Sequence, residues 1–372
     1  MNSMKKYIAL VIAMIVPFAL VANANAANET VTATTDLSPQ AGGNYFKEVT
    51  SSSQLTIRAE VHTPDDSPKV NPMKNVKITF PSGMTFKPNN SKTPVCSDSK
   101  LSPTSNLADP SAVVSSCSKS VVGSGTAAIF LAKVNLPETL IDDPILVVFN
   151  AGTNGSGQPK LKIYGYSKTT NVGILMTGTL KGSVLDIAIP VLSNDSAVKY
   201  FQLNIPGGQL DREDINVHVH GLDPNYVQAK CASSPLKTNA VFELGERSYP
   251  SGTPTGPTTT VTSPQTTQDC VGKAGTPKLG FNKVNGPSAV KNGKTGSYKV
   301  TIKNPGTATV KNVVVTNNRG GKTKAGNIAP GKTKTVSVKA KIKGKKGKKV
   351  AVKFPAKAGN VKASTTKQVK VK

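Results

Sequence analysis

His218 and His220 are the residues whose type and spacing come closest to metal chemistry in this 372-residue chain. Residues two apart on a β-strand point to the same face of a sheet, so both imidazoles could ligate one ion. Asp211, Glu213 and Asp214 offer carboxylates nearby in the sequence. Because no third ligand stands at a defined spacing, two readings stay open: a metal site, or an ordinary polar sheet face.

The remaining motifs do not point to catalysis. The carboxylate pairs Asp65-Asp66 and Asp142-Asp143 both neighbour prolines, which is typical of loops rather than of the opposed acids of a glycosidase. The segment 123–125, Gly-Ser-Gly, lacks a further glycine and a following helix, so we expect a turn there. Neither a nucleophile elbow, a zinc-protease motif nor a P-loop is present. We therefore expect no enzyme, no catalytic residue and no cofactor.

The four cysteines predict disulfide bonds. Their even number in a chain with an export signal (described next) favours bridges, and no C-x-x-C spacing suggests a metal centre. Of the three ways to pair them, the simplest joins sequence neighbours: Cys96 with Cys117, and Cys231 with Cys270.

The first 26 residues read as a secretory signal peptide. Lys5 and Lys6 precede an apolar run over residues 8–21, and Ala24-Asn25-Ala26 is a small-residue cleavage site. The alternative, a membrane anchor, is disfavoured because the run is shorter than the roughly 20 residues that a span needs. We expect a secreted, extracellular protein with no transmembrane anchor.

The rest of the chain alternates apolar and polar residues with the period of two that is typical of β-strands. Most of the candidate strands end at Gly, Pro, Asn or Asp, and no segment of helical length has a 3.6-residue period. The candidates before residue 270 are 55–61, 76–80, 127–134, 145–150, 161–166, 172–180, 185–189, 200–205, 215–220 and 240–244. An all-β fold follows, with one or two packed sheets stapled by disulfides in this part of the chain.

Residues 249–268, rich in Pro, Thr, Ser and Gly, allow two interpretations. They could form a plain linker. Alternatively, strand-forming residues at 258–262 and a Cys231–Cys270 bond would make them part of a stapled hairpin. The expected organisation is a signal peptide at 1–26, an all-β domain at 27–270, a linker at 271–275 and a second domain at 276–372.

Positive charge is concentrated in the last hundred residues. The formal charge of the chain is +27, yet residues 1–270 hold 21 basic and 20 acidic residues. Residues 271–372 contain 25 lysines, one arginine (Arg319) and no Asp or Glu. The chain is therefore a nearly neutral part joined to a polycation of +26.

This polycation keeps the alternation of a folded sheet. Apolar positions such as Tyr298, Val300 and Ile302 alternate with lysines, and Gly- and Pro-containing turns separate six or seven such segments. We expect an immunoglobulin-like sandwich with its lysines outside, rather than a disordered tail. Residues 345–349 are expected to be a hairpin tip.

Lysines without acidic neighbours suit dense negative charge rather than one shaped ligand. Few aromatic residues accompany them, so stacking on single-stranded nucleic acid is poorly supported. The residues expected to bind a polyanion are Lys339, Lys341, Lys343, Lys345, Lys346, Lys348 and Lys349.

The C-terminal segment resembles the CARDB-type and related conserved-repeat domains of bacterial surface proteins. The likeness rests on Gly296–Gly306, Val310–Thr316 and Ile328–Thr333, and it covers roughly residues 276–372. It implies an immunoglobulin-like sandwich with an adhesive or structural role and no catalytic residues. Residues 27–272 resemble secreted proteins of soil actinobacteria through the surroundings of Cys96, Cys117 and Cys270, which implies no activity.

Three functions follow as hypotheses. The first is an exported, non-enzymatic protein whose basic module binds an anionic cell-envelope polymer. The second is a secreted enzyme or ligand-binding domain at 27–270 that uses the module as a targeting tag. The third is an extracellular nucleic-acid binder.

Overall fold

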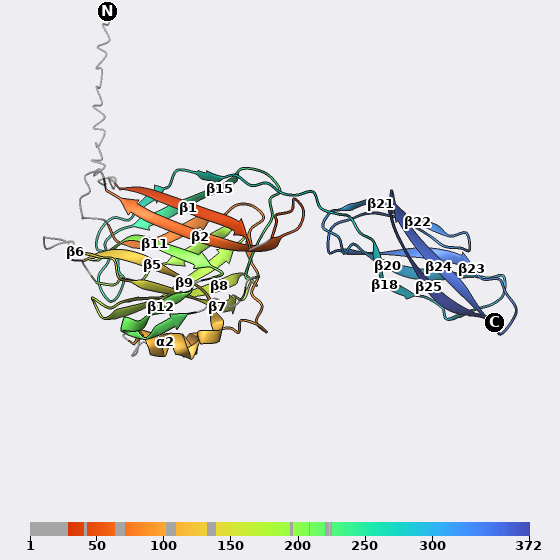
Figure 1. Ribbon diagram of the computed structural model, residues 1–372, viewed down its shortest axis with the longest axis horizontal. Helices are drawn as coiled ribbons and strands as arrows, with labels where there is room; N and C mark the ends of the chain where they lie inside the picture. The colour runs from red at the N-terminus through yellow and green to blue at the C-terminus, as the bar shows by residue number, and fades with distance from the viewer. Residues whose placement is uncertain are drawn as a thin grey trace, which may run out of the picture.

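The structure of the protein is a computed structural model that describes residues 29–40, 43–63, 71–101, 109–131, 139–193, 196–207, 209–219, 223 and 225–372. The expected signal peptide, Asp65-Asp66 and His220 lie outside these residues. The described chain is all-β, as the alternation predicts, and its strands gather into two bodies (Figure 1).

The first body is built on a 15-stranded sheet whose longest path runs β16-β15-β3-β10-β9-β8-β7-β5-β11-β2-β14-β4. β1 pairs with β2, β6 with β5, and β17 with β15. The strands are β1 Thr30–Pro39, β2 Ser51–His62, β3 Met73–Thr79, β4 Thr85–Phe86, β5 Val121–Leu131, β6 Thr139–Ile141, β7 Ile145–Thr153, β8 Pro159–Ser167, β9 Val172–Lys181, β10 Val184–Ala188, β11 Ala197–Ile205, β14 Val227–Ala229, β15 Leu236–Leu244, β16 Thr259–Thr262 and β17 Thr266–Gln268.

This sheet curls until its two flanks meet. The Thr35 hydroxyl of β1 lies 2.6 Å from that of Thr238 in β15, and Thr266 of β17 donates to the Ala33 carbonyl of β1. The inward side chains of β1–β3, β5, β7–β11 and β15 form the main apolar core inside the curl. The alternating burial of β2 and β15 reflects this arrangement, with one face inside and the other toward solvent.

Part of the sheet is covered on its outer face as well. Residues 145–149 of β7 are all buried, which explains their continuous apolar run. Their outer side packs with Tyr164 of β8 against the short helices α1 (Asp98–Leu101) and α2 (Pro110–Ser116) and against β13 (Val217–Val219), which pairs with β12 (Leu210–Arg212). The 3₁₀ turns η2 (Ser118–Ser120) and η3 (Glu213–Ile215) complete this cover.

Both predicted disulfides are confirmed, and the second resolves the nature of residues 249–268. Cys96 bonds Cys117, and Cys231 bonds Cys270. Between the latter two, β15 pairs with β16 and its first residues pair with β17. The segment is therefore part of a stapled hairpin and not a plain linker.

The prediction of a turn at Gly123-Ser124-Gly125 is wrong, because these residues lie inside β5. A Cβ at Gly125 would lie 1.9 Å from the Gln202 carbonyl oxygen of β11, and one at Gly123 would lie 2.3 Å from that of Asn204. Both glycines therefore serve a close approach of two backbones. The expected strand 215–220 is shorter than predicted, since Ile215 ends η3 and the strand begins at Val217.

The second body is a sandwich of two sheets, one of order β18-β20-β23 and one of order β19-β25-β24-β21-β22. Tyr298, Val300 and Ile302 face Val352 and Phe354 in a core that is sealed from solvent. The strands are β18 Gly280–Asn285, β19 Ala289–Val290, β20 Thr295–Lys303, β21 Val310–Thr316, β22 Lys322–Ile328, β23 Thr333–Lys341, β24 Lys349–Ala358 and β25 Val361–Val371. The prediction of a hairpin tip at residues 345–349 is wrong, because β23 and β24 belong to different sheets. Residues 342–348 connect the two strands, and Lys349 begins β24.

The two bodies touch where the chain passes from one to the other. Lys273 and Phe46 form an isolated parallel β-bridge. The Glu48 carboxylate accepts hydrogen bonds from the backbone N–H and the hydroxyl of Thr309. This junction lies at the end of the curled sheet where β1 finishes at Pro39 (Figure 1).

Candidate functional site

The strand period divides the lysines of the sandwich from its core. In β24, Val352, Phe354 and Ala356 are buried while Lys353 and Lys357 are exposed. Such alternation places successive side chains on opposite faces, so each sheet presents lysines outward. Because residues 271–372 contain no Asp or Glu, no side chain of this segment can neutralise them.

On the outer face of the three-stranded sheet, lysines face hydroxyl groups. Lys299 lies opposite Ser337, and Lys339 opposite Ser297. Lys341 and Lys303 lie opposite Thr295 and Thr333 in the same way. The cationic groups on this face are thus separated by short neutral residues.

The outer face of the five-stranded sheet brings lysines directly together. Lys357 lies opposite Lys362, and Lys349 lies opposite Lys370. All four are exposed. Directly opposed residues of an antiparallel pair have Cβ atoms about 5 Å apart, where like charges repel each other.

A third lysine extends the first of these pairs across the sheet. Val314 of β21 lies opposite both Lys357 in β24 and Lys324 in β22. With strands about 4.8 Å apart, Lys324 lies about 10 Å from Lys357 in the same row. We call Lys324, Lys357, Lys362, Lys349 and Lys370 the lysine face.

The polyanion residues expected from the sequence lie on three parts of the sandwich. Lys339 and Lys341 lie on the three-stranded sheet, and Lys343, Lys345, Lys346 and Lys348 lie in the loop between the sheets. Only Lys349 belongs to the lysine face. Lys357, Lys362 and Lys370 were not among the expected residues, although the two-residue turn Gly359-Asn360 fixes the register that opposes them.

One lysine of the sandwich is used internally. Lys367 points to the inner side of β25, and its Nζ lies 3.5 Å from the Val284 carbonyl oxygen of β18. It therefore closes the gap between the two sheets at one edge instead of contributing to either outer face.

The histidine candidate has carboxylate neighbours but no described metal cluster. The Nδ1 of His218 lies 3.3 Å from Asp211 Oδ1, and its Nε2 lies 3.9 Å from Glu213 Oε2. Asp214 is bound elsewhere, by Arg212 and Lys168, which lower its pKa. Within the described ranges, no group of three or more His, Cys, Asp or Glu side chains could hold a metal ion.

Asp143 fastens a turn. Its carboxylate accepts hydrogen bonds from the Ser167 hydroxyl at 2.7 Å and from the Thr169 N–H at 2.9 Å. Partial burial raises the pKa of Asp143, but these hydrogen bonds outweigh it and hold the pKa below its ordinary value. Asp142 beside it is exposed.

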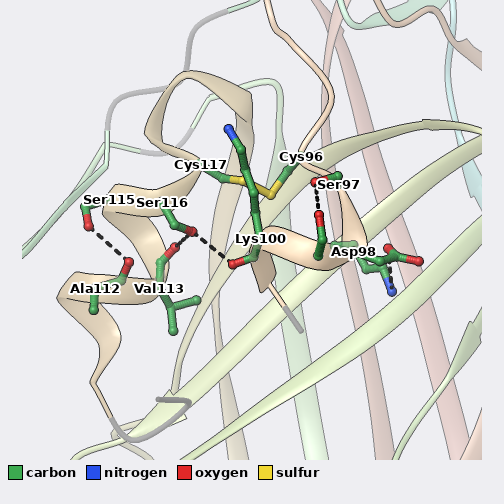
Figure 2. The surroundings of a disulfide bond; sticks show 11 residues. Cys96, Ser97, Asp98, Lys100, Ala112, Val113, Ser115, Ser116 and Cys117 are labelled. Atoms are coloured by element: carbon green, nitrogen blue, oxygen red, sulfur yellow. Dashed lines mark hydrogen bonds and ion pairs between the residues drawn. A yellow bond between two sulfur atoms is a disulfide. The ribbon is translucent and has the colours of Figure 1, made fainter. Parts of the chain in front are cut away.

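The Cys96–Cys117 disulfide supports the cover of the first body rather than a reactive centre. Figure 2 shows it joining the chain before α1 to the chain after α2. The Ser116 hydroxyl donates to the Val113 carbonyl at 2.8 Å and approaches that of Lys100 at 3.5 Å, which ties the two helices further.

One feature of the first body has no counterpart in the motifs of the sequence. An apolar cavity of about 400 Å³ lies inside the curl, between β5, β7, β8, β9, β10 and β11. Its lining comes from inward positions of six strands and from the loops that connect them, so only the three-dimensional arrangement reveals it.

Comparison with known proteins gives no match, either to a protein-family model or to a curated protein. In the part of the chain that the structure describes, no helix is long and apolar enough to cross a membrane. A functional assignment therefore rests on the geometry of the chain itself.

Proposed function

We propose that this is an exported, non-enzymatic protein whose C-terminal sandwich binds an anionic polymer of the cell envelope. The observation that carries the proposal is the lysine face: two directly opposed lysine pairs, and a fifth lysine in the row of the pair Lys357 and Lys362, on a body without acidic residues. The adhesive or structural role implied by the resemblance to CARDB-type domains agrees with it.

The spread of the charge favours a polymer over a small ligand. The lysine face spans the neighbouring strands β22, β21, β24 and β25 and is not recessed in any described pocket. Ammonium groups are strongly hydrated point charges, which recognise charge density rather than a planar or bidentate shape. A chain of regularly repeated phosphates or carboxylates can neutralise all five lysines at once and relieve their repulsion.

The export signal and the two disulfides support an extracellular setting for this binding. Anionic wall polymer is the partner that we propose in that setting, because a strong field of one sign concentrates molecules of opposite charge. Single-stranded nucleic acid is disfavoured because the aromatic residues of the sandwich offer no exposed stacking platform: Tyr298 and Phe354 are buried, and Phe281 is half-buried against the same core.

The test is binding of the full chain without its signal peptide to a poly(glycerol phosphate) wall polymer, with the double variant Lys357→Gln/Lys362→Gln. We expect at least tenfold weaker binding at low salt than for the parent. The matched control, Lys299→Gln/Lys339→Gln, removes the same charge from the other face and should weaken binding less.

Equal losses in both variants would contradict a role for the lysine face and leave only non-specific attraction. Binding to duplex DNA at least as tight as to the wall polymer would overturn the choice of partner. No binding at low salt would overturn the proposal altogether.

A further inference from the structure

The inside of the curled sheet is packed unevenly along its length. Toward the junction with the sandwich, Phe80, Phe86 and Tyr226 fill it, with ring centroids 5.5–6.2 Å apart along this series. At the opposite end, inward positions carry small residues such as Ala127 and Gly165. The cavity of about 400 Å³ lies there, which is within the range of ligand-binding pockets.

The register of the strands defines which end this is. The strand pairs follow this end of the sheet from β5 through β11 and β2 to β1: Phe130 pairs with Ala197, Tyr200 with Glu60, and His62 with Thr30. The cavity therefore lies at the end of the sheet where β1 begins. The junction with the sandwich lies at the other end, beyond Pro39 (Figure 1). A molecule can therefore enter the cavity while the lysine face is occupied.

The cavity is open to solvent on one side. Val172, at the start of β9, lines it and is 45% exposed, whereas Leu203 and Ile187 deeper inside are fully buried. Thr170 and Ser193 lie on the lining and are half-buried. Access from solvent distinguishes the cavity from a sealed packing defect.

The chemistry of the walls is uniform. Among the described residues of the lining there is no charged side chain, and Ile129, Ile163, Ile174 and Met176 are typical of its surface. Its hydroxyls lie near the end of β8 and in the connection between β10 and β11, and the Ser167 hydroxyl is already engaged by Asp143. A charged group placed in such a site would lose its hydration without gaining a partner.

We propose that this cavity binds one uncharged lipophilic molecule, with a hydrocarbon portion the size of a single acyl chain. Apolar surface of both ligand and cavity leaves water on binding, which supplies the affinity. The hydroxyl of Thr170 would lie beside a small polar end group such as an alcohol. This proposal is independent of polymer binding by the sandwich.

The experiment uses the full chain without its signal peptide and titrates it with N-phenyl-1-naphthylamine, an uncharged probe that fluoresces in apolar surroundings. Hexadecanol should displace the probe, and palmitate should do so at least tenfold less well. Saturating hexadecanol should also raise the unfolding temperature, since it binds only the folded state.

Two variants narrow the site. Ile174→Phe fills the cavity from β9, and Val172→Trp blocks it at the exposed position, where folding tolerates a large residue best. Both should weaken probe binding at least tenfold, while Leu175→Phe, on the opposite face of β9, should leave it unchanged. The Lys357→Gln/Lys362→Gln variant should bind the probe like the parent, which separates this proposal from polymer binding.

Absence of probe binding by the folded parent would overturn the proposal. So would unchanged binding in a folded Val172→Trp variant, because the probe would then bind elsewhere. Displacement by palmitate as effective as by hexadecanol would overturn the assignment of an uncharged ligand.

Discussion

Lys357 of β24 and Lys362 of β25 lie directly opposite each other on an exposed sheet face, and the same hairpin opposes Lys349 and Lys370. Directly opposed like charges destabilise an antiparallel pair. The sandwich thus carries electrostatic repulsion at a place where a neutral pair would be more stable. In the proposed function, an anionic partner relieves this repulsion.

Replacing one of the opposed lysines should separate stability from binding. In Lys362→Glu, an opposite-charge pair replaces a repulsive one, so β24 and β25 should gain about 0.2–1 kcal/mol of stability. Polymer binding should weaken at the same time. Amide hydrogen exchange of the two strands measures the first effect and a binding titration the second. A loss of protection in both strands would contradict the account of the repulsion.

Salt should act on folding and on binding in opposite directions. Screening reduces the repulsion among the 25 lysines and the one arginine of residues 271–372, so the sandwich should unfold at a higher temperature in 500 mM than in 10 mM NaCl. Hydrogen exchange of β20 and β24, measured as a function of temperature, would follow the unfolding of the sandwich separately from that of the first body. Lower protection at high salt would show that the repulsion is not significant.

The hydroxyl of Tyr298 should be dispensable. Tyr298 is fully buried against Phe354, burial raises its pKa, and its hydroxyl has no hydrogen-bond partner among the described residues. Tyr298→Phe should therefore leave the stability of the sandwich unchanged or increase it. Phe354→Ala, which removes the other ring, should cost about 3–5 kcal/mol. A destabilised Tyr298→Phe variant would reveal an ordered water on the hydroxyl.

Removing the Cys96–Cys117 disulfide should destabilise the first body by about 3 kcal/mol, since it closes a loop of 21 residues. The double variant Cys96→Ala/Cys117→Ala avoids a free thiol, and urea unfolding measures the loss. Reduced protection should be concentrated in α2 and the outer face of β7 and β8, where the apolar cluster that includes the bridge lies. Uniform loss over the whole body would contradict a local role.

The turn between β8 and β9 should loosen in acid. The pKa of Asp143 is below its ordinary value near 3.8, so its stabilising contribution is complete above that pH. It is lost as the pH falls further, through the pKa of the folded state. Exchange of the Thr169 amide should accelerate, after correction for intrinsic rates, between pH 4 and the lower limit of folding. Asp143→Asn should remove most of this dependence; the same pH profile in the variant would exclude Asp143 as its source.

The sequence predicts much of this fold because the period-two pattern is strong where one face of a strand is buried. The core positions Val300, Ile302 and Phe354 follow from it. Both disulfide pairs agree with the simplest pairing of cysteines that are neighbours in the sequence. The local pattern wrongly predicted a turn at Gly123 and Gly125. These residues are glycines because the backbone of β11, which is distant in the sequence, leaves no room for a side chain. The hairpin tip expected at 345–349 was also wrong, because no local pattern shows that β23 and β24 belong to different sheets.

The functional surfaces were less accessible to such reasoning. In the sequence, Lys357 and Lys362 are two separate cations. Only the register of the hairpin shows that they lie directly opposite each other. The cavity depends on how strands β5 to β11 curl together, and its residues are indistinguishable in the sequence from those of a filled core. Both sites arise from tertiary arrangement, which single-strand patterns do not encode.

The salt dependence of polymer binding tests the central claim most directly. We predict that the full chain binds poly(glycerol phosphate) at low salt with an affinity that falls steeply and linearly on a double-logarithmic salt plot. The slope should decrease by about 1 for each lysine removed from the lysine face. Binding that is insensitive to salt, or a slope that stays the same in Lys357→Gln/Lys362→Gln, would contradict the account.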